Sequence, residues 1–268
     1  MADTSSRTAS RAGWARLTRP ATSGALSVIG LILGLIAWQV AGTAEPVLLA
    51  TPARSFDAFV ALIGSGELGR ALGESGVIFG LGLALSIVVG VGYGILLARV
   101  RWLREATGWL IFALQAVPIV ALAPIIVVVV GFGIEAKTLV VFLSAVFPIL
   151  INTMEGAKHT PTALLDVTHI YRAREWRIWL DLLLPHTAPF AMTGIRQGIA
   201  MAFVGTLVAE FFLDANGIGG LMLAASATFD TPSVLALTVL TAVIAVALIG
   251  IGRLLERATA PWREEPEE

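Results

Sequence analysis

GVIFGLGLALSIVVGVGYGILLA, residues Gly76–Ala98, is a run of 23 residues without a charged side chain. An apolar helix of about 18–20 residues is long enough to cross a ~30 Å hydrocarbon layer, so this run predicts a transmembrane helix. Three more uncharged runs meet the same criterion, at Pro20–Ala44, Ala106–Ile134 and Thr231–Gly252. Two further runs carry one or two charged residues, at Thr138–Ala157 and Ala188–Leu213. The sequence therefore predicts an all-α integral membrane protein with six transmembrane helices.

The composition agrees with a single membrane domain, since 57% of the residues are hydrophobic and only 14% are charged. Lipid offers no partner to free backbone groups, and the alternating pattern of barrel strands is absent, so helices are the expected spanning elements. We assign the six helices to residues 24–257, with a long loop at 158–186 and tails at 1–23 and 258–268.

The basic residues orient the chain in the membrane. With the N-terminus in the cytoplasm, 14 of the 18 Lys and Arg residues fall inside; only Arg54, Arg70 and Lys137 fall outside, and Arg196 lies within a span. Such a bias is typical of cytoplasmic loops. It predicts a multi-pass protein of the cell (plasma or inner) membrane with both termini cytoplasmic. The first apolar run exceeds the ~7–15 residues of a typical cleaved signal, so we expect it to remain as a span.

The segment 45–75 between the first two spans is expected on the outer side. In it, Phe56, Phe59, Val60 and Ile63 recur at helical spacing. This pattern predicts a short amphipathic helix on the outer membrane surface.

The sequence gives little indication of an enzyme or a metal-binding protein. The chain has no cysteine, and its three histidines share one loop without the spacing of metal ligands. Gly131–Thr138 approaches a phosphate-binding loop, but Ala136 replaces the second glycine and no strand precedes it. The carboxylates Glu155 and Glu210 lie on different spans without a base beside them. We predict that the chain is not an enzyme and holds no metal or cofactor.

Prolines and charged residues mark candidates for a translocation path. Pro118 and Pro124 fall inside the third predicted span, where each removes a backbone donor and bends or breaks the helix. Arg196 and Glu210 are 14 residues apart on the fifth span, nearly four turns, and each costs about 2.5–3.5 kcal/mol if central in lipid. Two interpretations stay open: these side chains face a polar path, or they extend to the headgroups.

Small residues recur every four positions in three places: Gly76 and Gly80, Gly90 and Gly94, and Gly194, Gly198 and Ala202. Such a spacing puts them on one face of a helix and lets two backbones approach closely. We expect these faces to pack helices together, although a pore wall is an alternative use.

The loop that precedes the fifth span contains DVTHIYRAREWRIWLDLLLP, Asp166–Pro185, with three arginines and three acids. Its apolar residues predict two short helices, Thr162–Arg174 and Glu175–Leu184, with a charged elbow between them. Amphipathic helices of this kind either lie on the bilayer or insert into a groove of a partner.

The loop resembles the EAA motif, E-A-A-x(3)-G-x(9)-I-x-L-P, of permease subunits in binding-protein-dependent ABC importers. The matching positions are Asp166-Val167-Thr168, Arg172, Leu182 and Leu184-Pro185. Other segments are similar to the nitrate/sulfonate/taurine type of permease, over about residues 45–263: Thr51-Pro52 followed by Gly64–Leu68, Ala116-Val117-Pro118 leading to Gly131-Phe132-Gly133, Phe147-Pro148-Ile149 with Asn152-Thr153, and Ala209-Glu210 followed by Gly217-Ile218-Gly219-Gly220-Leu221. The resemblance implies a type I importer permease that works as a symmetric pair, with cytoplasmic ATPases that bind and hydrolyse ATP and an external substrate-binding protein.

The resemblance also implies a coupling loop, for which the candidate residues are Asp166, Arg172, Arg174, Trp176, Leu182, Leu184 and Pro185. Arg172 stands where the motif has its elbow glycine, which costs on the order of 1 kcal/mol or more if that residue needs a positive φ. We expect a permease for a small solute such as nitrate, a sulfonate, taurine or a related organic anion. The alternative is a membrane scaffold or regulatory subunit that keeps the fold without transport.

Overall fold

The computed structural model describes residues 20–45, 49–158, 160, 163, 168, 170–171 and 174–259, and all the regular secondary structure in these residues is helical. Its first half consists of α1 (Pro20–Ala44), α2 (Pro52–Gly64), α3 (Glu67–Arg99), α4 (Arg101–Gln115) and α5 (Ile119–Val130). Its second half consists of α6 (Ile134–Lys158), α8 (Glu175–Arg177), the π-helical segment η2 (Ile178–Leu183), α9 (Leu184–Phe212), α10 (Gly217–Ala227) and α11 (Thr231–Thr259).

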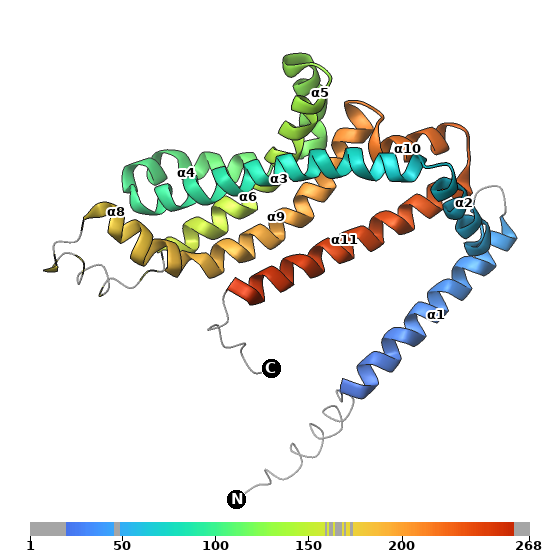
Figure 1. Ribbon diagram of the computed structural model, residues 1–268, viewed down its shortest axis with the longest axis horizontal. Coiled ribbons are helices and arrows are strands. Elements are labelled where there is room, and N and C mark those ends of the chain that lie inside the picture. Colours follow the sequence, from blue (N-terminus) through green and yellow to red (C-terminus); the bar gives the residue numbers. More distant parts are fainter. Residues whose placement is uncertain are drawn as a thin grey trace, which may run out of the picture.

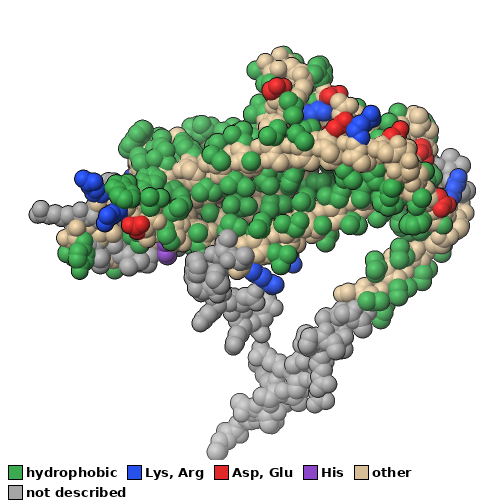
Figure 2. All heavy atoms as spheres, viewed as in Figure 1, with side chains coloured by type: hydrophobic (Ala, Val, Ile, Leu, Met, Phe, Trp, Pro, Cys, Tyr) green, Lys and Arg blue, Asp and Glu red, His purple; other side chains and the backbone are tan. Residues whose placement is uncertain are grey.

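Among the described residues, five helices are long and apolar enough to cross a membrane, and the bent pair α4–α5 makes a sixth. Charged side chains gather towards the two ends of the bundle, and the band between them is hydrophobic (Figure 2). The prediction of an all-α membrane protein with six spans is confirmed when the bent pair counts as one span.

The centre of the bundle is formed by α3, α6 and α9, which lie side by side (Figure 1). Glycines let these helices approach: a Cβ atom on Gly90 would stand 2.8 Å from Cγ2 of Ile149, and one on Gly94 would stand 2.8 Å from Cβ of Thr153. Ile149 is fully buried. Close contact between backbones supplies the van der Waals attraction on which helix association in lipid depends.

The outer helices meet little protein. Only 6% of the apolar window of α1 and 11% of that of α11 is buried, and α1 leans away from the bundle (Figure 1). Their exposed side chains are aliphatic, for example Leu31 and Val246. Lipid tails solvate such side chains as well as other apolar groups do, so their exposure carries no hydrophobic penalty in a membrane.

The third predicted span, Ala106–Ile134, is broken, which is one of the two predicted effects of its prolines. The chain forms α4 and α5, whose axes differ by 102°. Proline disfavours α-helical backbone at the preceding residue, here Val117, and the break falls at residues 116–118 with Pro118 as the N-cap of α5. Pro124 lies inside α5 and does not end it. Gly131 and Gly133, with φ of 91° and 136°, then turn the chain into α6.

The predicted amphipathic helix in segment 45–75 is present as α2, which begins at Pro52. Proline suits the first position of a helix because the N–H there has no helical partner. The second predicted loop helix, Glu175–Leu184, does not stand alone: α8 and η2 run directly into α9. Pro185 fits within the first turn of α9 and therefore does not separate the two elements.

Candidate functional site

The buried carboxylate of Glu210 lies near the end of α9 that faces α10. Its side chain is fully buried. The Ser75 hydroxyl of α3 donates to Oε1 at 2.5 Å, and the Gly219 N–H of α10 donates to Oε2 at 2.8 Å. Both oxygens accept hydrogen bonds, one from α3 and one from α10. Glu210 therefore connects three helices.

The first turn of α10 receives two more partners from α3. The Ile218 N–H donates to Ser75 Oγ at 3.0 Å, and the Gly217 N–H donates to Glu74 Oε2 at 3.0 Å. The side chain of the preceding residue, Asn216, makes no capping bond. The first N–H groups of a helix lack internal partners and carry a partial positive charge, so acids stabilise this position. We call Glu74, Ser75, Glu210 and the first turn of α10 the α10 cap.

Glycine is required at this turn for space and for backbone conformation. Gly217 has a φ of 76°, and a Cβ atom there would overlap Oε1 of Glu210. A Cβ atom on Gly219 would stand 2.7 Å from Cβ of Glu210. Gly220 has no room either, because its Cβ would overlap the carbonyl of Ala215. The run Gly217–Gly220 thus permits the carboxylate to reach the α10 backbone.

An ion pair ties α6 to the turn before α10. Lys137 is 3% exposed, and its Nζ lies 3.3 Å from Oδ2 of Asp214. Asn216 Nδ2 donates to the same oxygen at 2.6 Å. A buried ammonium is costly unless it is paired, so Asp214 is needed to compensate Lys137. This lysine belongs to the segment Gly131–Thr138 that approaches a phosphate-binding loop, and here it binds a carboxylate of its own chain.

Arg196 of α9 faces α11. Its Nε lies 3.2 Å from Oε2 of Glu256, and the Thr193 hydroxyl donates to Oε1 of the same carboxylate at 2.7 Å. A Cβ atom on Gly252 would stand 3.1 Å from Cγ of Arg196, so the two helices are close. The Arg196 side chain is one third exposed. Pairing with an acid lowers the cost of placing this arginine in a transmembrane helix.

Comparison with known proteins identifies the family. Residues 87–261, well over half of the chain, match the family described as binding-protein-dependent transport system inner membrane component. The chain belongs to this family. It is a permease subunit of an ABC importer, and such permeases are not themselves enzymes.

Three relatives show the range of the permease's similarity. A riboflavin transport system permease protein of Chloroflexus aurantiacus is 35% identical over 165 residues, and the match spans 62% of each chain. A formylaminopyrimidine transport permease protein of Halalkalibacterium halodurans is 31% identical over 188 residues, covering 70% of this chain and 75% of the relative. A nitrate import permease protein of Synechocystis is 26% identical over 200 residues, covering 71% and 73%.

The fold of the permease matches a solved structure. A chain of the MetNI methionine ABC transporter, in an inward-facing conformation, superimposes with a TM-score of 0.62 at 18% identity. The match covers 72% of this chain and 96% of that chain. The type I importer fold expected from the sequence is therefore confirmed.

The predicted packing face of the permease lies against α6. A Cβ atom on Gly194 would stand 3.0 Å from Cβ of Asn152, and one on Gly198 would stand 2.7 Å from Cδ1 of Ile149. Ala202 is fully buried in a cluster with Ile78, Val141 and Ala145. Gly76 and Gly80, which showed the same spacing, meet nothing within 4 Å in this chain.

The predicted coupling loop is described in part. Asp166 and Arg172 lie outside the described residues, so the consequence of arginine at the elbow stays a prediction. Arg174 and Trp176 are exposed, and the Arg177 guanidinium lies over the Trp176 ring at 5.4 Å. Leu182 is half-buried, whereas Leu184 and Pro185 are exposed.

The sequence singled out Glu210 and left two interpretations open: its side chain faces a polar path, or it extends to the lipid headgroups. In the structure the side chain is instead buried within the protein. A function of Glu210 in the translocation path stays a prediction. Glu74 and Ser75 were missed, because they are 135 or more residues from Glu210 in sequence and carry no motif. The glycine run Gly217–Gly220 was the available signal, since it marked a place where backbone and side chain approach. Among the described residues, no group of three or more His, Asp or Glu side chains can hold a metal.

Proposed function

We propose that this permease forms the translocation path for a small solute, and that the loop at 158–186 transmits the movement of cytoplasmic ATPase subunits to it. The observation that carries the proposal is the unbroken helical segment Ile178–Phe212. Its 35 residues extend about 50 Å at a rise of 1.5 Å per residue. One end adjoins Arg174 and Trp176 of the loop, and the other end holds α10 through Glu210.

The continuity of this segment supports a mechanical coupling. A displacement of the loop by an ATPase would move α9 together with α6, because the two helices share a long contact. At the far end Glu210 would carry α10 with it through hydrogen bonds rather than through the chain alone. In this proposal, access to the path changes between two arrangements of whole helices, as coupling between distant sites requires.

The proposed partners follow from the family and from the charge bias. They are two cytoplasmic ATPase subunits at the loop, a substrate-binding protein at the α10 end, and a second permease copy. ATP is bound by the ATPase subunits in this arrangement. The positive-inside bias supports cytoplasmic termini and an external α10 end.

We propose a nitrate-, sulfonate- or taurine-like anion, or a related organic anion, as the solute. The relative named as a nitrate permease supports this class of solute. The relatives named as riboflavin and formylaminopyrimidine permeases make heterocyclic solutes the alternative class to test. Arg196 is paired with Glu256, so its charge does not by itself favour an anion. Selectivity would then reside mainly in the binding protein.

Transport in proteoliposomes tests the proposal. The permease is reconstituted with candidate ATPase and substrate-binding proteins, and ATP-dependent uptake of nitrate, taurine and riboflavin is measured. We expect Trp176→Ala to lower both uptake and ATPase recruitment, because Trp176 is an exposed residue of the loop. Trp109→Ala, an equally large change at an exposed position on α4, is the matched control. ATPase recruitment without uptake of any solute would favour the scaffold alternative.

A further inference from the structure

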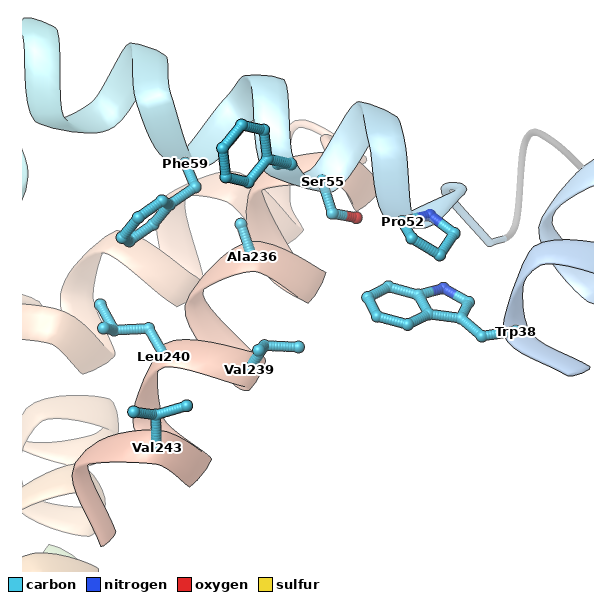
Figure 3. A pocket seen from close by; sticks show the side chains of 9 residues that line it. Trp38, Pro52, Ser55, Phe59, Ala236, Val239, Leu240 and Val243 are labelled. Carbon is cyan, nitrogen blue, oxygen red and sulfur yellow. The ribbon is translucent and has the colours of Figure 1, made fainter. Parts of the chain in front are cut away.

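Two carboxamide side chains lie where α6 and α9 meet, Asn152 and Gln197. They differ from the surface between the outer helices. There, aromatic and aliphatic side chains such as Trp38 and Val239 line the pocket formed by α1, α2 and α11 (Figure 3). Asn152 is half-buried and Gln197 is exposed. We call these two residues the amide pair.

Hydrogen bonds fix the orientation of both carboxamides. Asn152 Nδ2 donates to Gln197 Oε1 at 3.1 Å and to the carbonyl of Pro148 at 2.8 Å. The Gln197 oxygen is therefore engaged, and the two N–H bonds of its amide nitrogen are left over. Among the described residues, Gln197 makes no other hydrogen bond. The amide pair thus presents free N–H donors without a net charge.

The amide nitrogen of Gln197 lies at the depth of the hydrocarbon layer. Gln197 is 19 residues from Ile178 and 15 from Phe212, which are the ends of the 35-residue apolar segment. At 1.5 Å per residue these separations are about 29 Å and 23 Å, so Gln197 stays inside a ~30 Å layer for any placement of that layer within the segment. An N–H donor without an acceptor is unfavourable in lipid. The surface at Gln197 therefore faces something polar.

The residues around Gln197 favour a path over tight packing against a second permease copy. Close packing of helices in lipid uses small side chains. Four small residues of α9 already pack within their own chain: Gly194, Gly198, Ala202 and Gly205. Met201 and Val204, four and seven positions after Gln197 and so on its face of the helix, are larger and half exposed. A face of this kind suits the wall of a water-filled path between the two copies.

We propose that the amide pair lines the translocation path, and that Gln197 donates a hydrogen bond to an oxygen atom of the solute. This inference rests on the proposed function and adds a solute-contacting residue to it. An oxygen acceptor is common to nitrate, to the sulfonate group of taurine and to the carbonyl groups of riboflavin. In a symmetric pair of permeases, the second copy contributes its own amide pair from the opposite wall of the path.

Cysteine labelling of the full chain in lipid nanodiscs tests the location. The chain has no cysteine, so Gln197→Cys supplies a single thiol. We expect it to react with a cationic, water-soluble methanethiosulfonate roughly tenfold faster or more than Leu31→Cys, an exposed apolar position on α1, because the reactive thiolate is disfavoured in apolar surroundings. Equally slow reaction at both positions would overturn the path. A disulfide between two Gln197→Cys copies, without labelling, would overturn it in favour of direct contact with the second copy.

Protection by solute tests the hydrogen bond. Met201→Cys places the thiol one turn from Gln197 and leaves the amide pair intact. We expect nitrate, taurine or riboflavin, each added separately, to slow its labelling, and the solute that protects identifies the oxygen acceptor. Gln197→Leu should raise the half-protecting concentration roughly three- to tenfold, whereas Gln197→Asn, which keeps an N–H donor, should raise it less.

Protection that is unchanged in Gln197→Leu, or protection by none of the three solutes, would overturn the contact between Gln197 and the solute. Labelling needs neither an ATPase nor uptake, so these results are separate from the transport assay of the proposed function. A permease that takes up no solute but shows both labelling and protection would refute transport and leave the amide pair as a solute site.

Discussion

Replacement of Glu210 by glutamine tests whether the α10 cap holds α10 in place. The glutamine side chain has nearly the same shape, but only one of its two terminal groups accepts hydrogen bonds. In the wild type, Ser75 and Gly219 both donate to this carboxylate. In Glu210→Gln, one of these donors faces the amide nitrogen and loses its acceptor. The other bond persists without the assistance of a negative charge.

The size of the effect follows from these two bonds. A hydrogen bond to a charged group contributes about 1.5–3 kcal/mol and a neutral one about 0.5–1.5 kcal/mol, and a buried donor without an acceptor costs about 1–3 kcal/mol. Relief of the desolvation of a buried charge offsets part of this loss. We therefore expect α10 to lose about 2–4 kcal/mol of local stability, or roughly 30- to 700-fold in its opening equilibrium.

Hydrogen–deuterium exchange of the permease in lipid nanodiscs measures this change. Amides of Gly217–Ala227 should exchange faster by that factor, whereas those of α6 should keep their protection, because α6 packs on α9 through apolar contacts away from Glu210. Glu135→Gln, an equal change at an exposed acid, is the control and should alter neither segment. Assembly should persist and uptake should change. Unchanged protection of α10 in Glu210→Gln would refute the idea that the carboxylate holds this helix.

Four further predictions concern packing, pairing, coupling and topology. Gly198→Leu should prevent close packing of α9 on α6 and lower the yield of folded protein, since its Cβ alone would stand 2.7 Å from Ile149; Gly80→Leu, where nothing lies within 4 Å, should be tolerated by the isolated chain, as measured by size-exclusion chromatography. Glu256→Ala should leave the buried part of Arg196 unpaired and lower the melting temperature, an effect that the double variant with Arg196→Ala should partly reverse. Arg172→Gly should preserve membrane insertion but change the amount of ATPase that co-purifies with the permease. An unchanged amount would contradict the prediction that the elbow at Arg172 contacts the ATPase. Single cysteines in either tail of this cysteine-free chain should react only from the cytoplasmic side, and reaction of the two tails from opposite sides would contradict the six-span topology.

The bend between α4 and α5 illustrates a limit of sequence reasoning. Pro118 and Pro124 are both prolines in one apolar run, and the pattern gave no reason to treat them differently. The structure does: at Pro118 the two preceding residues leave the helix, while at Pro124 the helix continues. The glycines at 131 and 133 allow the return to α6, so the chain can turn aside by 102° at Pro118 without losing its next span.

The sequence by itself determined which segments enter the membrane, because length and the absence of charge govern transfer into lipid residue by residue. It also determined the helical class, the small-residue face of Gly194, Gly198 and Ala202, and the amphipathic helix α2, since each depends on spacing along one helix. The tertiary structure alone decided that Glu210 meets Ser75 and the first turn of α10, and that Arg196 meets Glu256. These contacts join helices far apart in the chain, and a polar group in lipid takes whichever partner the packing of the bundle brings within reach.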